Sequence, residues 1–155
     1  VGATVDGFIG DAAVTVGVGR ITPEAQDLID VTKLCLEQGI KATVEGARVG
    51  DIGAAIEEVA QSRGYSVVRE YVGHGVGRFL HEEPQIPNYG PPSRGPLLRR
   101  GMVLAIEPMV NAGGWKTRLL EDQWTVVTTD GSLSAHFEHT VGITDGKPTV
   151  FTSLQ

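Results

Sequence analysis

Short apolar segments separated by turn-forming residues run through most of the chain and predict a protein rich in strands. The first two segments, Val1–Val5 and Phe8–Val18, flank Asp6-Gly7. Because glycine tolerates the positive φ of a tight two-residue turn, this pattern predicts a β-hairpin. Asp11 lies inside the second segment, where carboxylates are depleted, so this residue needs a specific role.

Two longer segments carry apolar residues at helical spacing and predict helices. The first begins with Thr22 as its N-cap, followed by a proline in the first helical position, and Gly39 closes or bends it. The second runs over Asp51–Arg63, with Asp51 as its N-cap, and Gly64 ends it.

Further apolar and β-branched segments predict strands in the second part of the chain. These are Tyr65–Val72, Met102–Ile106, Trp124–Thr129, Leu133–Ile143 and Thr149–Thr152. Five of the eight prolines lie in residues 84–96, which are predicted to form an ordered loop because apolar residues anchor it. The order of elements predicts an α+β fold, with two helices packed on one face of a curved, mainly antiparallel sheet.

Composition and charge narrow the class of protein. The 155 residues, 41% apolar and 21% charged, fit one globular domain with a substantial core. The net charge of −6, without a long basic run, argues against a nucleic-acid surface. No apolar segment reaches the roughly 20 residues that span a bilayer, so no membrane contact is expected. Cys35 is the only cysteine, which excludes an internal disulfide and favours a cytoplasmic protein.

Four strand-like segments each contain one polar residue that is unfavourable there: Asp11, His74, Glu107 and Glu138. Buried carboxylates are costly unless they are paired, hydrogen-bonded or bound to metal, and three together would repel one another. A divalent cation relieves that repulsion. Three carboxylates and one imidazole suit Mn²⁺, Fe²⁺, Co²⁺ or Zn²⁺ better than Ca²⁺ or Mg²⁺, and several bridging carboxylates favour a two-metal site.

Each of these residues also has an ordinary structural explanation when it is taken alone. Asp11 next to a turn is compatible with a cap or a strand edge, Glu107 before a proline with a solvated strand end, and Glu138 with an exposed edge strand. His74 is less ordinary, because glycines on both sides let its backbone approach a neighbour closely, and His81 follows shortly after it. The joint pattern, and not any single residue, predicts the metal site.

Five motifs, in their order and spacing, resemble those of type I methionine aminopeptidases over essentially the whole chain. They are Asp6–Asp11, Gly73–Gly77, His81–Pro84, Gly101–Met109 and Ser134–Thr140. The resemblance implies a pita-bread fold, of which this chain supplies the C-terminal half, and a centre of two divalent metal ions. It also implies a substrate, the N-terminal methionine of nascent polypeptides, which the enzyme removes.

The resemblance further implies a role for each matched residue. Asp11 and Glu138 would bridge the two metal ions, and His74 and Glu107 would complete the shell of one of them. Glu107 would also shuttle a proton beside the metal-activated water. His81 would bind the substrate by a hydrogen bond near the scissile peptide, without a metal role, and help to stabilise the tetrahedral intermediate.

Other positions match the family's substrate pocket or flank the ligands. Trp124 matches a residue that borders the methionine pocket, although core packing would explain it without the resemblance, and Tyr71 lies close to that pocket. Leu80 stands where relatives often have an aromatic pocket residue. His136 and His139 flank Glu138 and are expected to be exposed or to lie behind the ligands.

The chain departs from the family pattern at its start. The family's fifth ligand is an aspartate eleven residues before the position of Asp11, which falls just before Val1. Residues 1–155 are therefore expected to form a single metallopeptidase catalytic domain truncated at the N-terminus, whose missing half would be a partner covering an exposed apolar face. Such a chain is expected to hold one tight metal ion where the full enzyme holds two, and to turn over weakly or not at all.

Two other interpretations stay open. An Xaa-Pro aminopeptidase or dipeptidase of the same fold shares the ligand set, although His81–Pro84 and the Trp124 region resemble methionine aminopeptidases more. A non-catalytic pita-bread binding module is the other alternative. Such relatives usually lose metal ligands, whereas all four ligands within reach of this chain are present.

Overall fold

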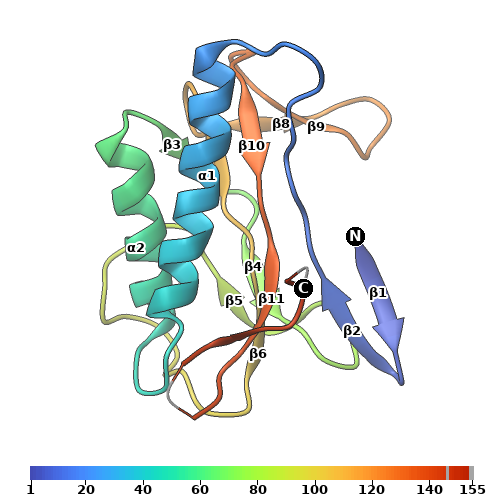
Figure 1. Cartoon of the computed structure of the whole chain (residues 1–155), viewed down its shortest axis with the longest axis vertical. Helices are drawn as coiled ribbons and strands as arrows, with labels where there is room; N and C mark the ends of the chain where they lie inside the picture. Colours follow the sequence, from blue (N-terminus) through green and yellow to red (C-terminus); the bar gives the residue numbers. More distant parts are fainter. Residues whose placement is uncertain (146, 154–155) are drawn as a thin grey trace.

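The computed structural model describes residues 1–145 and 147–153, which form two long helices and a set of short strands (Figure 1). The helices are α1 (Pro23–Ala42) and α2 (Val49–Ser62). The strands are β1 (Gly2–Val5), β2 (Phe8–Asp11), β3 (Ser66–Val67), β4 (Gly73–Gly75), β5 (Glu82–Ile86), β6 (Val103–Ile106), β7 (Met109–Asn111), β8 (Thr117–Leu119), β9 (Val126–Thr128), β10 (Ser134–His136), β11 (His139–Gly142) and β12 (Thr149–Val150). Within these described residues, no helix combines the length and the apolar character that a membrane span requires.

Helix α1 begins as predicted but continues past its predicted end. The Thr22 hydroxyl accepts the N–H of Ala25 at 3.2 Å, as an N-cap does. Gly39 lies inside α1 and is buried, so it does not close the helix. A Cβ at this position would lie 2.9 Å from the Ile56 side chain of α2. The glycine therefore lets the two helices approach each other closely.

Helix α2 begins before the predicted start. Its N-cap is Arg48, and Asp51 lies in the first helical turn, where its carboxylate accepts the Arg48 N–H at 2.7 Å. The prediction of Asp51 as N-cap is therefore wrong, because the aspartate reaches back to the cap from inside the helix. Gly64, with a φ of 78°, follows the end of α2 as predicted.

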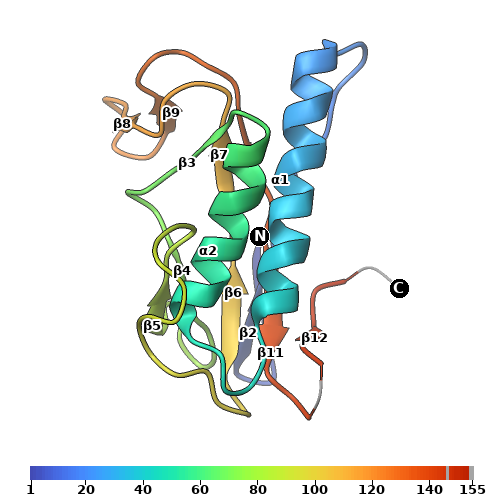
Figure 2. The ribbon, with the colours of Figure 1, turned by 90° about the vertical axis from the view of Figure 1, so that its left-hand side faces the viewer.

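Antiparallel strands form the layer that the helices cover. A five-stranded sheet has the order β12-β11-β6-β4-β5, a three-stranded sheet has the order β10-β7-β3, and β1-β2 and β8-β9 form two further pairs. Both helices lie on the same side of β6, β7 and β10 (Figure 1 and Figure 2). The α+β class with mainly antiparallel strands is confirmed, but the strands form separate sheets where one continuous sheet was predicted.

Two breaks in the strands lie next to each other in this layer. Glu107-Pro108 separates β6 from β7, and Phe137-Glu138 breaks the predicted strand Leu133–Ile143 into β10 and β11. The Phe137 N–H donates to the Pro108 carbonyl at 3.3 Å, so the two breaks face each other. Both glutamates therefore leave the regular hydrogen-bond ladder at one place in the molecule.

Other predicted strands are present in shortened form. The segment Phe8–Val18 pairs with β1 only as far as Asp11. Beyond it, the Thr15 hydroxyl accepts the His136 N–H at 2.9 Å and donates to the His136 carbonyl at 2.8 Å. A side chain thus makes the contacts that a strand backbone would have made. The segment Tyr65–Val72 likewise keeps only β3 as a strand.

The core lies between the helices and the strands. Leu28, Leu36, Ile52 and Ile56 of the helices are buried in one cluster with strand residues, which include Leu104, Ile106, Val110 and Val141. Full burial of a side chain of this size stabilises the fold by about 1.5–3 kcal/mol. This packing fixes the strands that flank the two interruptions.

Candidate metal centre and adjoining cavity

Asp11 is held by hydrogen bonds from a strand far away in the sequence. Its backbone N–H donates to the Thr140 hydroxyl, which in turn donates to the Asp11 carbonyl, and both distances are 2.8 Å. Two residues further on, the Ala13 N–H donates to the Glu138 carbonyl at 3.3 Å, and the Glu138 N–H donates to the Ala13 carbonyl at 2.9 Å. The main chains that carry the two carboxylates are therefore fastened to each other.

His74 occupies the middle of β4, where glycines allow close packing. A Cβ at Gly73 would overlap the Ala105 carbonyl oxygen of β6, and a Cβ at Gly75 would overlap the Glu83 carbonyl oxygen of β5. The His74 Nδ1 lies 2.9 Å from the Gly75 carbonyl oxygen. When Nδ1 donates this hydrogen bond, the lone pair of Nε2 is left for a metal ion.

The four residues predicted as metal ligands converge in the structure. Asp11, His74 and Glu138 each offer a ligand atom, and these three atoms lie within 4.8 Å of one another. Glu107 approaches from the opposing interruption, with its Oε1 3.4 Å from the His74 Nε2. Side chains from four separate segments therefore surround one point, and we call this set the metal cluster. That these residues bind metal stays a prediction.

The electrostatics of the cluster suit a divalent cation. Burial, aided by the charges of Glu138 and Asp11, raises the pKa of Glu107 to about 8. Burial and the Asp11 carboxylate raise the pKa of Glu138 to about 7. Without a cation, the cluster therefore favours protons on its carboxylates, and a divalent ion would take their place. Three carboxylates and one imidazole fit Mn²⁺, Fe²⁺, Co²⁺ or Zn²⁺.

His81 lies beside the cluster on its open side. Its ring centroid is 4.4 Å from that of His74, and the two rings meet edge to face at 69°. His81 is exposed, whereas His74 is buried. Both rings line a cavity of about 350 Å³ together with Glu82 and Glu83. The exposed imidazole is therefore placed to meet a molecule that approaches the cluster from solvent.

A second cavity, of about 300 Å³, begins at Glu107, and we call it the Tyr71 cavity. Its lining includes Tyr71 and His136 as well as the apolar side chains of Val68, Met109 and Val126. Glu107 belongs both to this cavity and to the metal cluster, so the two sites are continuous. A bound molecule can therefore place an apolar group in the cavity while its polar end reaches the cluster.

Two further polar residues line this cavity. His136, which was expected to be exposed or to lie behind the ligands, has a buried Nε2 that lies 3.7 Å from the Glu107 Oε2 and has no hydrogen-bond partner among the described residues. Sequence reasoning missed Asn111, which is buried and whose Oδ1 also has no hydrogen-bond partner among the described residues. No local pattern in the sequence distinguishes Asn111 from an ordinary strand residue.

The other predicted substrate contacts lie outside the Tyr71 cavity. Trp124 lies between β8 and β9, is 86% exposed, and does not line the cavity. Leu80 is 39% exposed and lies near Gly2 of the hairpin. Their roles as substrate contacts stay predictions. His139 is partly buried, and its Nδ1 lies 2.9 Å from the Thr152 hydroxyl, which places it behind the cluster residues.

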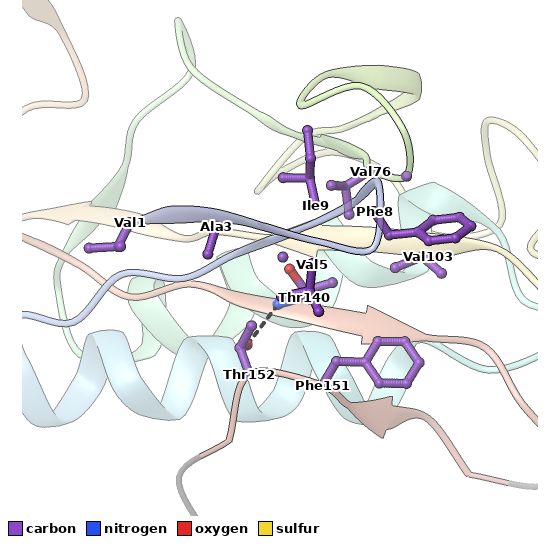
Figure 3. Close-up of a pocket in the computed structure, with 12 residues that line it drawn as sticks. Val1, Ala3, Val5, Phe8, Ile9, Val76, Val103, Thr140, Phe151 and Thr152 are labelled. Atoms are coloured by element: carbon purple, nitrogen blue, oxygen red, sulfur yellow. Dashed lines mark hydrogen bonds between the residues drawn. The ribbon is translucent and has the colours of Figure 1, made fainter.

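A further cavity, of about 500 Å³, contains none of the predicted ligands. Figure 3 shows apolar side chains of the hairpin, including Val5 and Phe8, facing Phe151 across it. The Thr152 hydroxyl accepts the Thr140 N–H at 3.0 Å at its edge. The side chains that line it are apolar apart from the hydroxyls of Thr140 and Thr152, so none of them is an acid or an imidazole that could activate water.

Comparisons with known proteins identify the family. The chain is 52% identical over 151 residues to the methionine aminopeptidase of Clostridium acetobutylicum, with 97% of this chain and 60% of that protein covered. It is 52% identical over 145 residues to methionine aminopeptidase 1 of Bacillus subtilis, with 94% and 58% covered. The chain thus spans about 60% of the length of these curated relatives.

Solved structures agree with the sequence matches. The structure of methionine aminopeptidase from Thermotoga maritima superposes with a TM-score of 0.96 at 52% identity, and the match covers 99% of this chain and 61% of that one. A dipeptidase from Pyrococcus horikoshii gives a TM-score of 0.75 at 26% identity, covering 99% and 38%. Residues 1–145 match the family model of metallopeptidase family M24. The chain therefore belongs to metallopeptidase family M24.

Proposed function

We propose that this protein is a metal-dependent aminopeptidase that removes the N-terminal methionine of nascent polypeptides. The observation that carries the proposal is the continuity of the metal cluster with the Tyr71 cavity through Glu107. The likeness to methionine aminopeptidases at 52% identity supports the same reaction. A cytoplasmic location, where new polypeptides carry their first methionine, belongs to this proposal.

The metal cluster would hold the divalent ions. Asp11, His74, Glu107 and Glu138 would hold the ions, and this chain would hold at most one of them tightly. When bound, such ions supply Lewis-acid chemistry, which activates water and polarises a peptide carbonyl. Mn²⁺, Fe²⁺, Co²⁺ and Zn²⁺ all suit this donor set.

The protein side chains would then position the substrate and move protons. Glu107, which borders both cluster and cavity, would accept a proton from the attacking water and pass it to the leaving amine. The exposed His81 imidazole would donate a hydrogen bond to the substrate at the scissile peptide and stabilise the developing oxyanion. The apolar walls of the Tyr71 cavity would take the side chain of the N-terminal residue, and Trp124 and Leu80 would contact the substrate from outside that cavity.

The test compares metal-loaded protein on two kinds of peptide. Purified protein with Mn²⁺, Fe²⁺, Co²⁺ or Zn²⁺ is given Met-Gly and Ala-Pro peptides of equal length, and released amino acids are measured by mass spectrometry. We expect weak release of methionine, which Glu138→Gln abolishes and Glu37→Gln, on the exposed side of α1, leaves unchanged. Absence of methionine release with every metal, together with a failure to bind any of these metals, would contradict the proposal.

Cleavage before proline is the second candidate. The 26% identity to a dipeptidase with a TM-score of 0.75 is the observation that favours it. Faster release of alanine from the Ala-Pro peptide than of methionine from the Met-Gly peptide would select this candidate. Metal binding without any cleavage would instead select a non-catalytic member of the fold.

A further inference from the structure

Arg69 lies at the meeting point of three elements outside the metal cluster. Its guanidinium carbon lies 5.1 Å from the centroid of the Tyr89 ring and 5.3 Å from that of the Trp115 ring. Its Nη2 lies 3.5 Å from the Glu57 Oε1. Glu57 belongs to α2, Tyr89 to the loop after β5, and Trp115 to the turn between β7 and β8. One side chain therefore joins three segments that are distant in the sequence, and we call this arrangement the Arg69 clasp.

The clasp depends on the shape of the guanidinium as well as on its charge. A planar guanidinium stacks on aromatic faces while its N–H groups reach a carboxylate, which an ammonium group cannot do in the same way. Glu57 adds a further link, because its Oε2 accepts the Gly90 N–H at 3.1 Å and thereby ties the loop of Tyr89 to α2. The loop of Tyr89 and the turn of Trp115 are thus both connected to α2.

The clasp also borders the Tyr71 cavity through the main chain. Arg69 lies between Val68 and Tyr71 in the connection from β3 to β4, and both of these residues line the cavity. Trp115 is close in sequence to Thr117, which lines the same cavity from β8. Movement of the clasp would therefore shift two walls of the cavity together.

We propose that Arg69 is a positioning residue that sets the width of the Tyr71 cavity and so controls which N-terminal side chain the protein accepts. The proposal rests on the proposed function, in which this cavity receives that side chain. Arg69 does not touch the reacting atoms, and its contacts given above include no residue of the metal cluster. Loss of the clasp should therefore weaken substrate binding and selectivity while metal affinity stays the same.

The kinetic test compares Arg69→Met and Arg69→Lys with the unmodified protein, and Lys116→Met is the matched control. Lys116 Nζ lies 5.7 Å from the same Trp115 ring, so its loss removes a positive charge there without breaking the clasp. For Arg69→Met we expect KM for Met-Gly peptides to rise severalfold with little change in kcat, because the walls of the Tyr71 cavity lose the contacts that hold them in place. Discrimination against an N-terminal phenylalanine should fall, and Arg69→Lys should restore only part of it.

Hydrogen exchange gives a second readout that does not need turnover. The Val68 N–H donates to the Met109 carbonyl at 2.9 Å and the Val76 N–H donates to the Val103 carbonyl at 3.0 Å. In Arg69→Met, exchange should accelerate at Val68 and stay unchanged at Val76. Unchanged exchange at Val68, or unchanged KM and selectivity in an active protein, would overturn the proposal. If the unmodified protein binds no metal and cleaves no peptide, the proposed function fails by itself, and exchange at Val68 alone decides whether the clasp holds this wall.

Discussion

The Thr140 hydroxyl closes a two-way hydrogen-bond pair with the backbone of Asp11, accepting its N–H and donating to its carbonyl, each at 2.8 Å. Thr140 belongs to β11 and is buried, so these bonds are shielded from water. They set the position of Asp11 relative to Glu138, which lies two residues before Thr140. A hydroxyl with no contact to a metal ion thereby controls the spacing of two predicted ligands.

Replacement of this hydroxyl by a methyl group should weaken metal binding. Thr140→Val keeps the shape of the side chain but leaves two backbone groups of Asp11 without partners, which should cost about 1–3 kcal/mol of stability. We expect metal affinity to fall about tenfold, as for loss of other outer contacts to ligands. Isothermal titration with Mn²⁺ or Co²⁺ measures this.

Thr32→Val is the matched control for that change. Thr32 is equally buried in α1, and its hydroxyl donates to the Leu28 carbonyl at 2.7 Å, away from the metal cluster. The control should lose stability without losing metal affinity. Equal loss of affinity in both variants would show that Thr140 acts only through general stability.

Replacement of His74 and of His139 by alanine should show that His74 binds metal and His139 does not. His74→Ala should lower metal affinity by more than about 100-fold, beyond the range for residues that only support a ligand. His139→Ala should lower metal affinity by much less than about 100-fold, because its Nδ1 contacts Thr152 and not the cluster. Calorimetry on both variants tests the assignment, which fails if the two lose the same affinity.

The metal-free protein should become less stable as the pH rises from 6.5 to 8. Burial raises the pKa of Glu107 to about 8 and that of Glu138 to about 7. The two glutamates make the folded state bind more protons than the unfolded state in this range, which lowers the free energy of unfolding by up to about 1.4 kcal/mol per pH unit for each proton. Burial lowers the pKa of His136 and of His139 and so acts in the opposite direction below pH 6.5, which leaves the glutamates to set the slope above it. The stabilisation is complete below the unfolded pKa and is lost as the pH passes through the folded pKa.

Urea unfolding of the metal-free protein at several pH values measures this slope. Glu107→Gln should flatten it, because the amide does not titrate. Addition of a divalent ion should reverse the trend, since a cation competes with protons for the same carboxylates and binds more tightly at higher pH. A metal-free stability that is constant or rises between pH 6.5 and 8 would contradict the expected protonation of Glu107 and Glu138.

Glycine at position 73 should be required for the geometry of β4. In Gly73→Ala the added methyl group would overlap the Ala105 carbonyl oxygen, which belongs to a backbone that cannot move away easily. We expect a loss of about 1–3 kcal/mol in stability and weaker metal binding, because His74 shifts with its strand. Chemical denaturation and metal titration measure the two effects.

Gly10→Ala is the control for that substitution. Gly10 also lies next to a predicted ligand, Asp11, but a Cβ there would be 3.7 Å from the Thr152 side chain, an ordinary contact. Its stability should change by less than about 0.5 kcal/mol. If both alanine variants behave alike, the close approach of β4 to β6 is not what glycine provides.

The metal cluster could be predicted because four apolar segments each contain one polar residue that is costly to bury. Asp11, His74, Glu107 and Glu138 each have an ordinary explanation alone, and only their joint pattern indicates a metal site. The α+β class followed from the periodicity of apolar residues within each segment.

Features that depend on distant contacts were missed or misplaced. The break at Phe137-Glu138 was not predicted because Leu133–Ile143 reads as one strand, and only the opposing Pro108 carbonyl explains the interruption. Sequence reasoning places Asp51 at the cap because aspartate is common both there and in the first turn, where its carboxylate instead accepts the N–H of the cap residue Arg48. The Arg69 clasp has no local signature, since its partners come from three other segments.

The opposed breaks at Glu107-Pro108 and Phe137-Glu138 have a consequence for how this chain can vary. Successive residues of an extended segment point to opposite sides, so one residue inserted or deleted on either side of a break would turn its glutamate away from the cluster. The number of residues in β6–β7 and in β10–β11 is therefore restricted as strictly as the identity of the glutamates. Length changes should be tolerated in the turns outside these strands, and one inside them should abolish metal binding even with all four ligands retained.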